Sequence, residues 1–98
     1  MSKKVVFSPT ATRKLLVLLE YLENKWSEKV KKEFIEKLDK SILRITDFPK
    51  SCSESIEIKG LFKCVVTKQT SLFYRIKSKE IEVVTLFDTR QNPKKLKV

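Results

Sequence analysis

The sequence predicts an α+β fold in the order β-α-α-β-β-β, in which a helical hairpin packs on one face of a small antiparallel sheet. Three observations predict it. Apolar residues recur every three or four positions over residues 9–48, as on one face of a helix. They then recur at every second position over residues 62–86, as on one face of a strand. Only one glycine and three prolines occur in 98 residues, so no flexible linker is visible and we expect a single domain over residues 1–98.

The amino-terminal half is expected to form two antiparallel helices. Ser8 and Ser27 are suitable N-caps, because a serine hydroxyl can accept a hydrogen bond from a free N–H of the first helical turn. The helices should cover about residues 9–25 and 28–48, and so short a connection forces them to be neighbours. The apolar segment 5–7 before them should join the sheet, at a position that the sequence does not determine.

The carboxyl-terminal half is expected to form an antiparallel meander of three strands, separated by polar turns at 68–70 and 77–80. One alternating set of side chains should cover the helices. It comprises Phe62, Cys64, Val66, Leu72, Tyr74, Ile76, Ile81, Val83 and Thr85. Residues 50–54 are expected to be a polar loop, and Ile56 and Ile58 a short additional strand.

The composition excludes several classes of chemistry. Histidine is absent, which removes the commonest metal ligand and the usual acid–base group near neutral pH. Cys52 and Cys64 are too few for a disulfide scaffold, so we interpret them as inert thiols, Cys64 in the core. We expect no metal and no cofactor, since one glycine also leaves no phosphate-binding loop.

The location is expected to be the cytoplasm. The longest apolar run, Leu15–Leu19, is far shorter than the ~20 residues of a membrane-spanning helix, and no signal peptide is visible at the amino terminus. The charge is strongly one-sided, with 22 Lys and Arg against 12 Asp and Glu and a net charge of +10. Such a chain attracts polyanions such as nucleic acid, a ribosome or an acidic protein, although any single lysine is more simply a solvated one.

The order of elements and two segments resemble the RelE/ParE superfamily of type II toxin–antitoxin systems. The segments are "FSPTATRKLLVLLEYLENKW" at 7–26, similar to the first helix of ParE-like members, and "LFYRIKSKEIEVVTLFDTRQNPKKL" at 72–96. The resemblance implies a toxin that is harmless in complex with its cognate antitoxin and that halts growth when free. RelE-like members cleave messenger RNA in the ribosome, whereas ParE-like members poison DNA gyrase.

The catalytic positions of RelE-like nucleases are mostly unmatched, and this favours the ParE-like members. The resemblance places basic residues on the middle strands and after the last strand; Lys63 and Arg90 match these positions, whereas Val65 and Ser71 do not. The carboxyl-terminal histidine or tyrosine that would act as an acid is also missing. Losing such transition-state contacts costs roughly 10²–10³ in rate each, so ribonuclease activity is doubtful. Lys63 and Arg90 remain the only catalytic candidates.

The basic residues of the strands and the tail are the candidates for binding the target or RNA. They are Lys63, Arg75, Arg90, Lys94 and Lys95. Structural alternatives stay open: Arg90 can pair with Asp88 in a turn, Arg75 can pair across strands with Glu82, and the lysine tail can simply be solvated.

An antitoxin is expected to cover the outward face of the sheet, where apolar side chains alternate with the inward set. The candidates are Val65, Phe73, Val84 and Leu86. The antitoxin segment should be acidic and partly disordered when alone, and a homodimer or a toxin–antitoxin hetero-oligomer is possible on this sequence. Three functions remain: a gyrase-binding toxin, a RelE-like endonuclease with a degenerate site, and a basic nucleic-acid-binding domain without toxicity.

Overall fold

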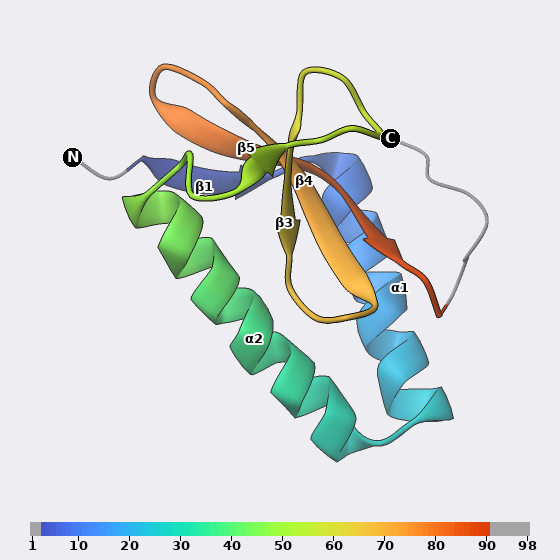
Figure 1. The fold of residues 1–98 in the computed structure, drawn as a ribbon. Helices are drawn as coiled ribbons and strands as arrows, with labels where there is room; N and C mark the ends of the chain where they lie inside the picture. Colours follow the sequence, from blue (N-terminus) through green and yellow to red (C-terminus); the bar gives the residue numbers. More distant parts are fainter. Residues whose placement is uncertain (1–2, 91–98) are drawn as a thin grey trace.

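A computed structural model describes residues 3–90, and it has two helices on one side of a five-stranded sheet (Figure 1). The elements follow in the order β1 (Lys4–Phe7), α1 (Pro9–Lys25), α2 (Glu28–Asp47), β2 (Ser53–Glu54), β3 (Phe62–Val65), β4 (Thr70–Ile76) and β5 (Glu80–Asp88). The expected α+β class and the helical hairpin are confirmed.

Both helices begin at the predicted caps. The Ser8 Oγ accepts a hydrogen bond from the Ala11 N–H at 3.0 Å, and the Ser27 Oγ accepts one from the Val30 N–H at 3.1 Å. Ser8 also donates its hydroxyl to the carbonyl oxygen of Val84 at 2.7 Å, which ties the start of α1 to β5. The cap therefore serves two purposes, because it satisfies a free N–H of the helix and fixes the helix against the sheet.

The strand order is β1-β5-β4-β3-β2, and the sheet is mixed. Strands β3 to β5 pair antiparallel as expected, and β2, within the expected loop 50–54, pairs antiparallel with β3. The first strand, whose place the sequence left open, pairs parallel with β5, with Val5 opposite Ile81, and this makes the sheet mixed. The physical reason is that β1 pairs with β5, which lies far along the chain. Parallel neighbours need a long connection between them, and the helices and the other strands provide it.

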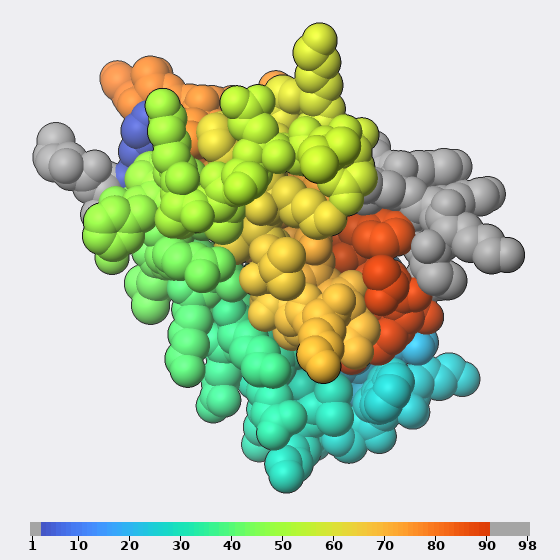
Figure 2. Space-filling model, viewed as in Figure 1, coloured from blue at the N-terminus to red at the C-terminus, as the bar shows by residue number. Residues whose placement is uncertain are grey.

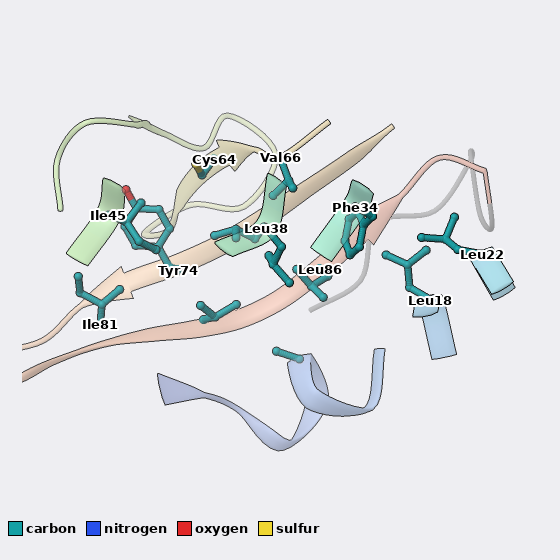
Figure 3. Packing of buried hydrophobic residues seen from close by; sticks show 13 residues of the cluster. Leu18, Leu22, Phe34, Leu38, Ile45, Cys64, Val66, Tyr74, Ile81 and Leu86 are labelled. Carbon is teal, nitrogen blue, oxygen red and sulfur yellow. The ribbon is translucent and has the colours of Figure 1, made fainter. Parts of the chain in front are cut away.

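The main core lies between the helices and the sheet, where side chains from both layers converge (Figure 3). Its fully buried members include Leu18 and Leu22 of α1, Ile45 of α2, and Leu72 and Tyr74 of β4. The Tyr74 hydroxyl reaches the rim of the core and donates to the carbonyl oxygen of Pro49 at 2.7 Å. The expected positions of Tyr74 and Cys64 in the core are confirmed.

A β-bulge in β5 changes which side chains face the helices. Tyr74 pairs with Val83 and Phe73 pairs with Thr85, so Val84 is an extra residue in β5. Before the bulge the odd-numbered residues of β5 face the helices, and after it Leu86 does, as its place in the main core shows. The predicted inward Thr85 and outward Leu86 are therefore wrong, because strict alternation does not survive an inserted residue.

The opposite face of the sheet carries a second, smaller core. Leu61, Phe73 and Val84 are buried there, with Ile58 and Phe87 packed against them. The segment 55–61 forms the cover: the Ser55 N–H donates to the carbonyl oxygen of Leu61 at 2.7 Å, and Gly60 adopts a φ of 87° that favours glycine. The short strand expected at Ile56 and Ile58 is absent from this segment; β2 lies earlier, and Ile56 is 97% exposed.

Candidate functional site

Lys63 and Arg75 lie on the outer face of the sheet, as predicted, and each is paired with a carboxylate. The Lys63 Nζ is 2.5 Å from the Glu57 Oε2 and 6.0 Å from the centroid of the Phe73 ring. The hydrogen bond from Lys63 is the main reason why the pKa of Glu57 lies below its ordinary value. The Arg75 Nε is 3.3 Å from Glu82, directly opposite on β5, so the cross-strand pair that the sequence allowed is formed.

Arg90 is the centre of a compact cluster at the other end of β5. Its Nη2 and Nε are 2.7 Å and 3.1 Å from the two carboxylate oxygens of Asp88, and its guanidinium lies 5.8 Å from the centroid of the Trp26 ring. Asp88 is buried and also accepts hydrogen bonds from the Arg90 N–H and from the Thr70 hydroxyl. The structure therefore supports the turn-holding interpretation of Asp88 and Arg90.

Within residues 3–90, the sequence-predicted cations are each paired with a different carboxylate. Glu57 binds Lys63, Asp88 binds Arg90, and Glu82, at the other end of β5, binds Arg75 of β4. The two unmatched positions, Val65 and Ser71, lie directly opposite each other on β3 and β4. Tyr74 lies on the opposite face, in the main core, where its hydroxyl donates a hydrogen bond to the carbonyl oxygen of Pro49 and burial raises its pKa. Lys94 and Lys95 lie outside the described residues.

The exposure expected for the antitoxin patch is wrong for three of its four residues. Phe73 and Val84 lie on the predicted face but are 1% and 7% exposed, because segment 55–61 covers them. Leu86 is in the main core as a result of the bulge. Only Val65 is open to solvent, with an exposure of 58%.

A basic surface that the sequence analysis missed lies beside Val65. Lys37, Lys40 and Arg44 of α2 line a hollow of about 310 Å³ together with Ser41, Val65 and Val66; we call it the basic hollow. It lies where α2 (green) meets the β3–β4 hairpin (yellow) on the face seen in Figure 2. Its sequence signal is the spacing of residues 37, 40 and 44, which places three cations along one stripe of a helix.

The basic hollow carries positive charge that no ion pair offsets. Within residues 3–90, Lys37 and Lys40 form no ion pair, whereas Lys63, Arg75 and Arg90 each have a carboxylate partner. An exposed apolar side chain next to unpaired cations suits an acidic segment that also presents an apolar residue. Across residues 3–90, no cluster of three or more His, Cys, Asp or Glu residues could hold a metal ion. Neither α1 nor α2 is long and apolar enough to cross a bilayer.

Comparison with known families decides the classification. The family described as "ParE toxin of type II toxin-antitoxin system, parDE" matches residues 5–93, which is nearly the whole chain. The chain belongs to the ParE toxin family. The resemblance to the RelE/ParE superfamily, and to its ParE-like members in particular, is thereby confirmed.

Solved structures show how widely the fold of this ParE-family protein occurs. It is similar to the chromosomal ParDE toxin–antitoxin system from P. aeruginosa, with a TM-score of 0.74 and 11% identity, covering 89% of this chain and 96% of that one. A RelBE toxin–antitoxin complex from Mycobacterium tuberculosis has a TM-score of 0.59 and 16% identity, covering 90% and 99%. The YoeB dimer from Staphylococcus aureus has a TM-score of 0.60 and 14% identity, covering 89% and 97%. No curated protein sequence gives a significant match.

The fold is thus shared by several toxin groups, and likeness at these identities establishes the fold alone. The target of this ParE-family toxin has to be argued from its own surface. Its exposed large apolar side chains lie mostly on the helices and at the end of α2. They are Leu16, Val17, Trp26, Leu43 and Phe48, together with Val65 of β3 and Ile56.

Proposed function

We propose that this ParE-family toxin halts growth by binding DNA gyrase and that it does not cleave RNA. The observation that carries the proposal is the state of the nuclease positions. Val65 and Ser71 stand where the nuclease resemblance places cations, and the two cations that are present, Lys63 and Arg90, are each bound to a carboxylate. Stabilising a phosphorane needs free positive charge at the reacting phosphate, and this arrangement does not supply it. Binding an enzyme requires only a complementary surface.

The proposal includes a cognate antitoxin that carries an acidic segment. The ParDE and RelBE structures to which the chain is similar are described as toxin–antitoxin systems or complexes. In this chain the basic hollow and the exposed Val65 provide unpaired cations beside an apolar side chain. An acidic segment seated there would neutralise Lys37 and Lys40 and cover Val65. This surface replaces the sheet patch expected from the sequence.

The test separates the target from the chemistry. Purified full-length protein is added to a DNA supercoiling reaction containing gyrase, and to a ribosome translation reaction in which transcripts are mapped for cleavage. We expect inhibition of supercoiling at unchanged transcript integrity. In cells, induced expression should raise a DNA-damage reporter before protein synthesis falls. Normal supercoiling in the presence of excess protein would overturn the gyrase assignment.

The RelE-like alternative makes the opposite prediction. It requires ribosome-dependent transcript cleavage that disappears in the Lys63→Ala variant while the melting temperature stays unchanged. Lys63 is a suitable position for this control because its side chain is 34% exposed and lies outside both cores. Cleavage that survives both Lys63→Ala and Arg90→Ala would instead indicate a contaminating nuclease.

The third possibility, a nucleic-acid-binding domain without toxicity, rests on the net charge of +10 and loses the one aromatic ring that the sequence analysis considered well placed. Proteins that bind single strands stack bases on exposed aromatic rings. Phe73, the ring that the sequence offered for this purpose, is 1% exposed under segment 55–61. Tight, salt-dependent binding to bare DNA or RNA together with harmless expression would restore this alternative.

A further inference from the structure

Cys52 and Cys64 lie next to each other at the edge of the sheet. The pairs Ser53–Lys63 and Glu54–Phe62 define the antiparallel register of β2 and β3, and one step further this register places Cys52 opposite Cys64. Residues directly opposite in an antiparallel pair have Cα atoms roughly 4.5–5.5 Å apart, within the range that a disulfide spans. Both cysteines are free thiols, and Cys52 packs against the core cluster that contains Cys64.

Arg44 brings the two sulfur atoms into one small cluster. Its Nη2 lies 3.0 Å from the Sγ of Cys64 and 3.9 Å from the Sγ of Cys52. A guanidinium in this position favours the thiolate, which is the reactive form of cysteine. Burial, and then the neighbouring Cys52 thiol, hold the pKa of Cys64 above its ordinary value.

The two thiols differ in access to solvent. Cys64 is 0% exposed, whereas Cys52 is partly exposed in the chain segment between α2 and β2. A small oxidant can therefore reach Cys52 but not Cys64. This is the arrangement of an attacking thiol with a resolving thiol behind it.

We propose that Cys52 and Cys64 are a redox pair that closes reversibly into an intramolecular disulfide by exchange with a low-molecular-weight disulfide. The Cys52 thiolate attacks one sulfur of that disulfide and expels one thiolate, leaving a mixed disulfide on Cys52. The Cys64 thiolate then attacks the Cys52 sulfur and expels the second thiolate. The protein dithiol is oxidised by two electrons, the small disulfide is reduced to two thiols, and the two protein protons end on those thiols.

The new bond would join the segment between α2 and β2 to β3. That segment continues directly into residues 55–61, which cover Phe73 and Val84 on the outer face. Only two residues of β2 hold it to the sheet in the reduced protein. Oxidation would therefore fix the cover of the second core where only β2 attaches it to the sheet, and it would remove the thiol partners of Arg44, which lines the basic hollow.

The test uses the full chain, reduced and then freed of reductant, and oxidised glutathione as the probe. Free thiols are counted over time, and the intact mass is measured. We expect the wild type to lose both thiols, to lose the mass of two hydrogen atoms and to retain no glutathione. Its melting temperature should rise on oxidation and return to the starting value after reduction.

Two single variants separate the attacking thiol from the resolving thiol. Cys64→Ser should stop at the mixed disulfide and keep one glutathione on Cys52, because no resolving thiol is present. Cys52→Ser should remain unmodified over the time in which the wild type is fully oxidised. The pair is disproved if native wild type accumulates the stable mixed disulfide, forms disulfide-linked dimers, keeps both thiols free, or melts at a lower temperature when oxidised.

Discussion

Asp88 has in the fold the turn-holding role that the sequence allowed for it. It closes β5, where a carboxylate beside an arginine could belong to a site. In the structure its oxygens accept from the Arg90 backbone and guanidinium and from the Thr70 hydroxyl. Burial works to raise the pKa of Asp88, but these hydrogen bonds outweigh it, so the net pKa lies below 3.8. Asp88 is therefore charged at neutral pH and stabilises the end of the sheet.

Replacing Asp88 with Asn should lower the free energy of unfolding at pH 7 by about 1–3 kcal/mol, because Arg90 loses its charged partner. A lowered folded pKa stabilises the protein above the unfolded value near 3.8, and this contribution is lost as the pH falls through the folded pKa. The difference between wild type and Asp88→Asn should therefore shrink below pH 3.8. Urea unfolding over a pH series measures it. Asp39→Asn, at an exposed position of α2, should change stability by no more than about 0.5 kcal/mol.

At the scale of elements, the sheet is buried on both faces over its centre. The helices cover one face, and segment 55–61 covers Phe73 and Val84 on the other. An apolar side chain on the outer face is thus either part of the second core or, like Val65 at the end of β3, free to contact a partner. The two kinds of position should respond differently to truncation.

Phe73→Ala should destabilise the fold by about 3–5 kcal/mol, because it leaves a cavity under the cover. Val65→Ala should change stability by less than about 0.5 kcal/mol, because its side chain already lies in water. Thermal melts of the two variants provide the comparison. A mild effect at Phe73 together with a severe one at Val65 would show that the second core is misassigned.

At the scale of the molecule, the net charge is +10, and some of the basic residues are in ion pairs whereas others are not. Glu57, Glu82 and Asp88 pair with Lys63, Arg75 and Arg90, whereas Lys37 and Lys40 of the basic hollow form no ion pair within the described chain. Unpaired charge on a surface steers an oppositely charged partner toward it. The long-range attraction of this chain for an acidic segment should therefore centre on α2.

The double variant Lys37→Glu/Lys40→Glu should slow association with a poly-glutamate peptide by about tenfold at low salt, and the difference should fade at high salt. Stopped-flow measurements at several ionic strengths test this. Lys29→Glu/Lys32→Glu is the matched control: it changes the net charge equally, on the same helix, at exposed residues that do not line the hollow. Equal slowing by both variants would mean that net charge alone, and not the basic hollow, governs association.

The sequence by itself determined the two helices, their caps and the inward sides of β3 and β4. These features depend on local physics: a serine hydroxyl near a free N–H, and apolar residues repeating with the period of a helix or a strand. The pairs Arg75–Glu82 and Asp88–Arg90 were also foreseeable, because their members lie close along the chain or across a short turn. The family followed from the same order of elements.

Only the tertiary structure decided the rest. The extra residue Val84 reverses the alternation of β5, so that Leu86 lies in the main core. Strand β1 pairs parallel with β5, and Val5 lies opposite Ile81, 76 positions away in the chain. Segment 55–61 buries Phe73, and the basic hollow lies where α2 meets the end of β3. These outcomes depend on which distant surfaces meet, and periodicity within one element carries no information about the element that will cover it.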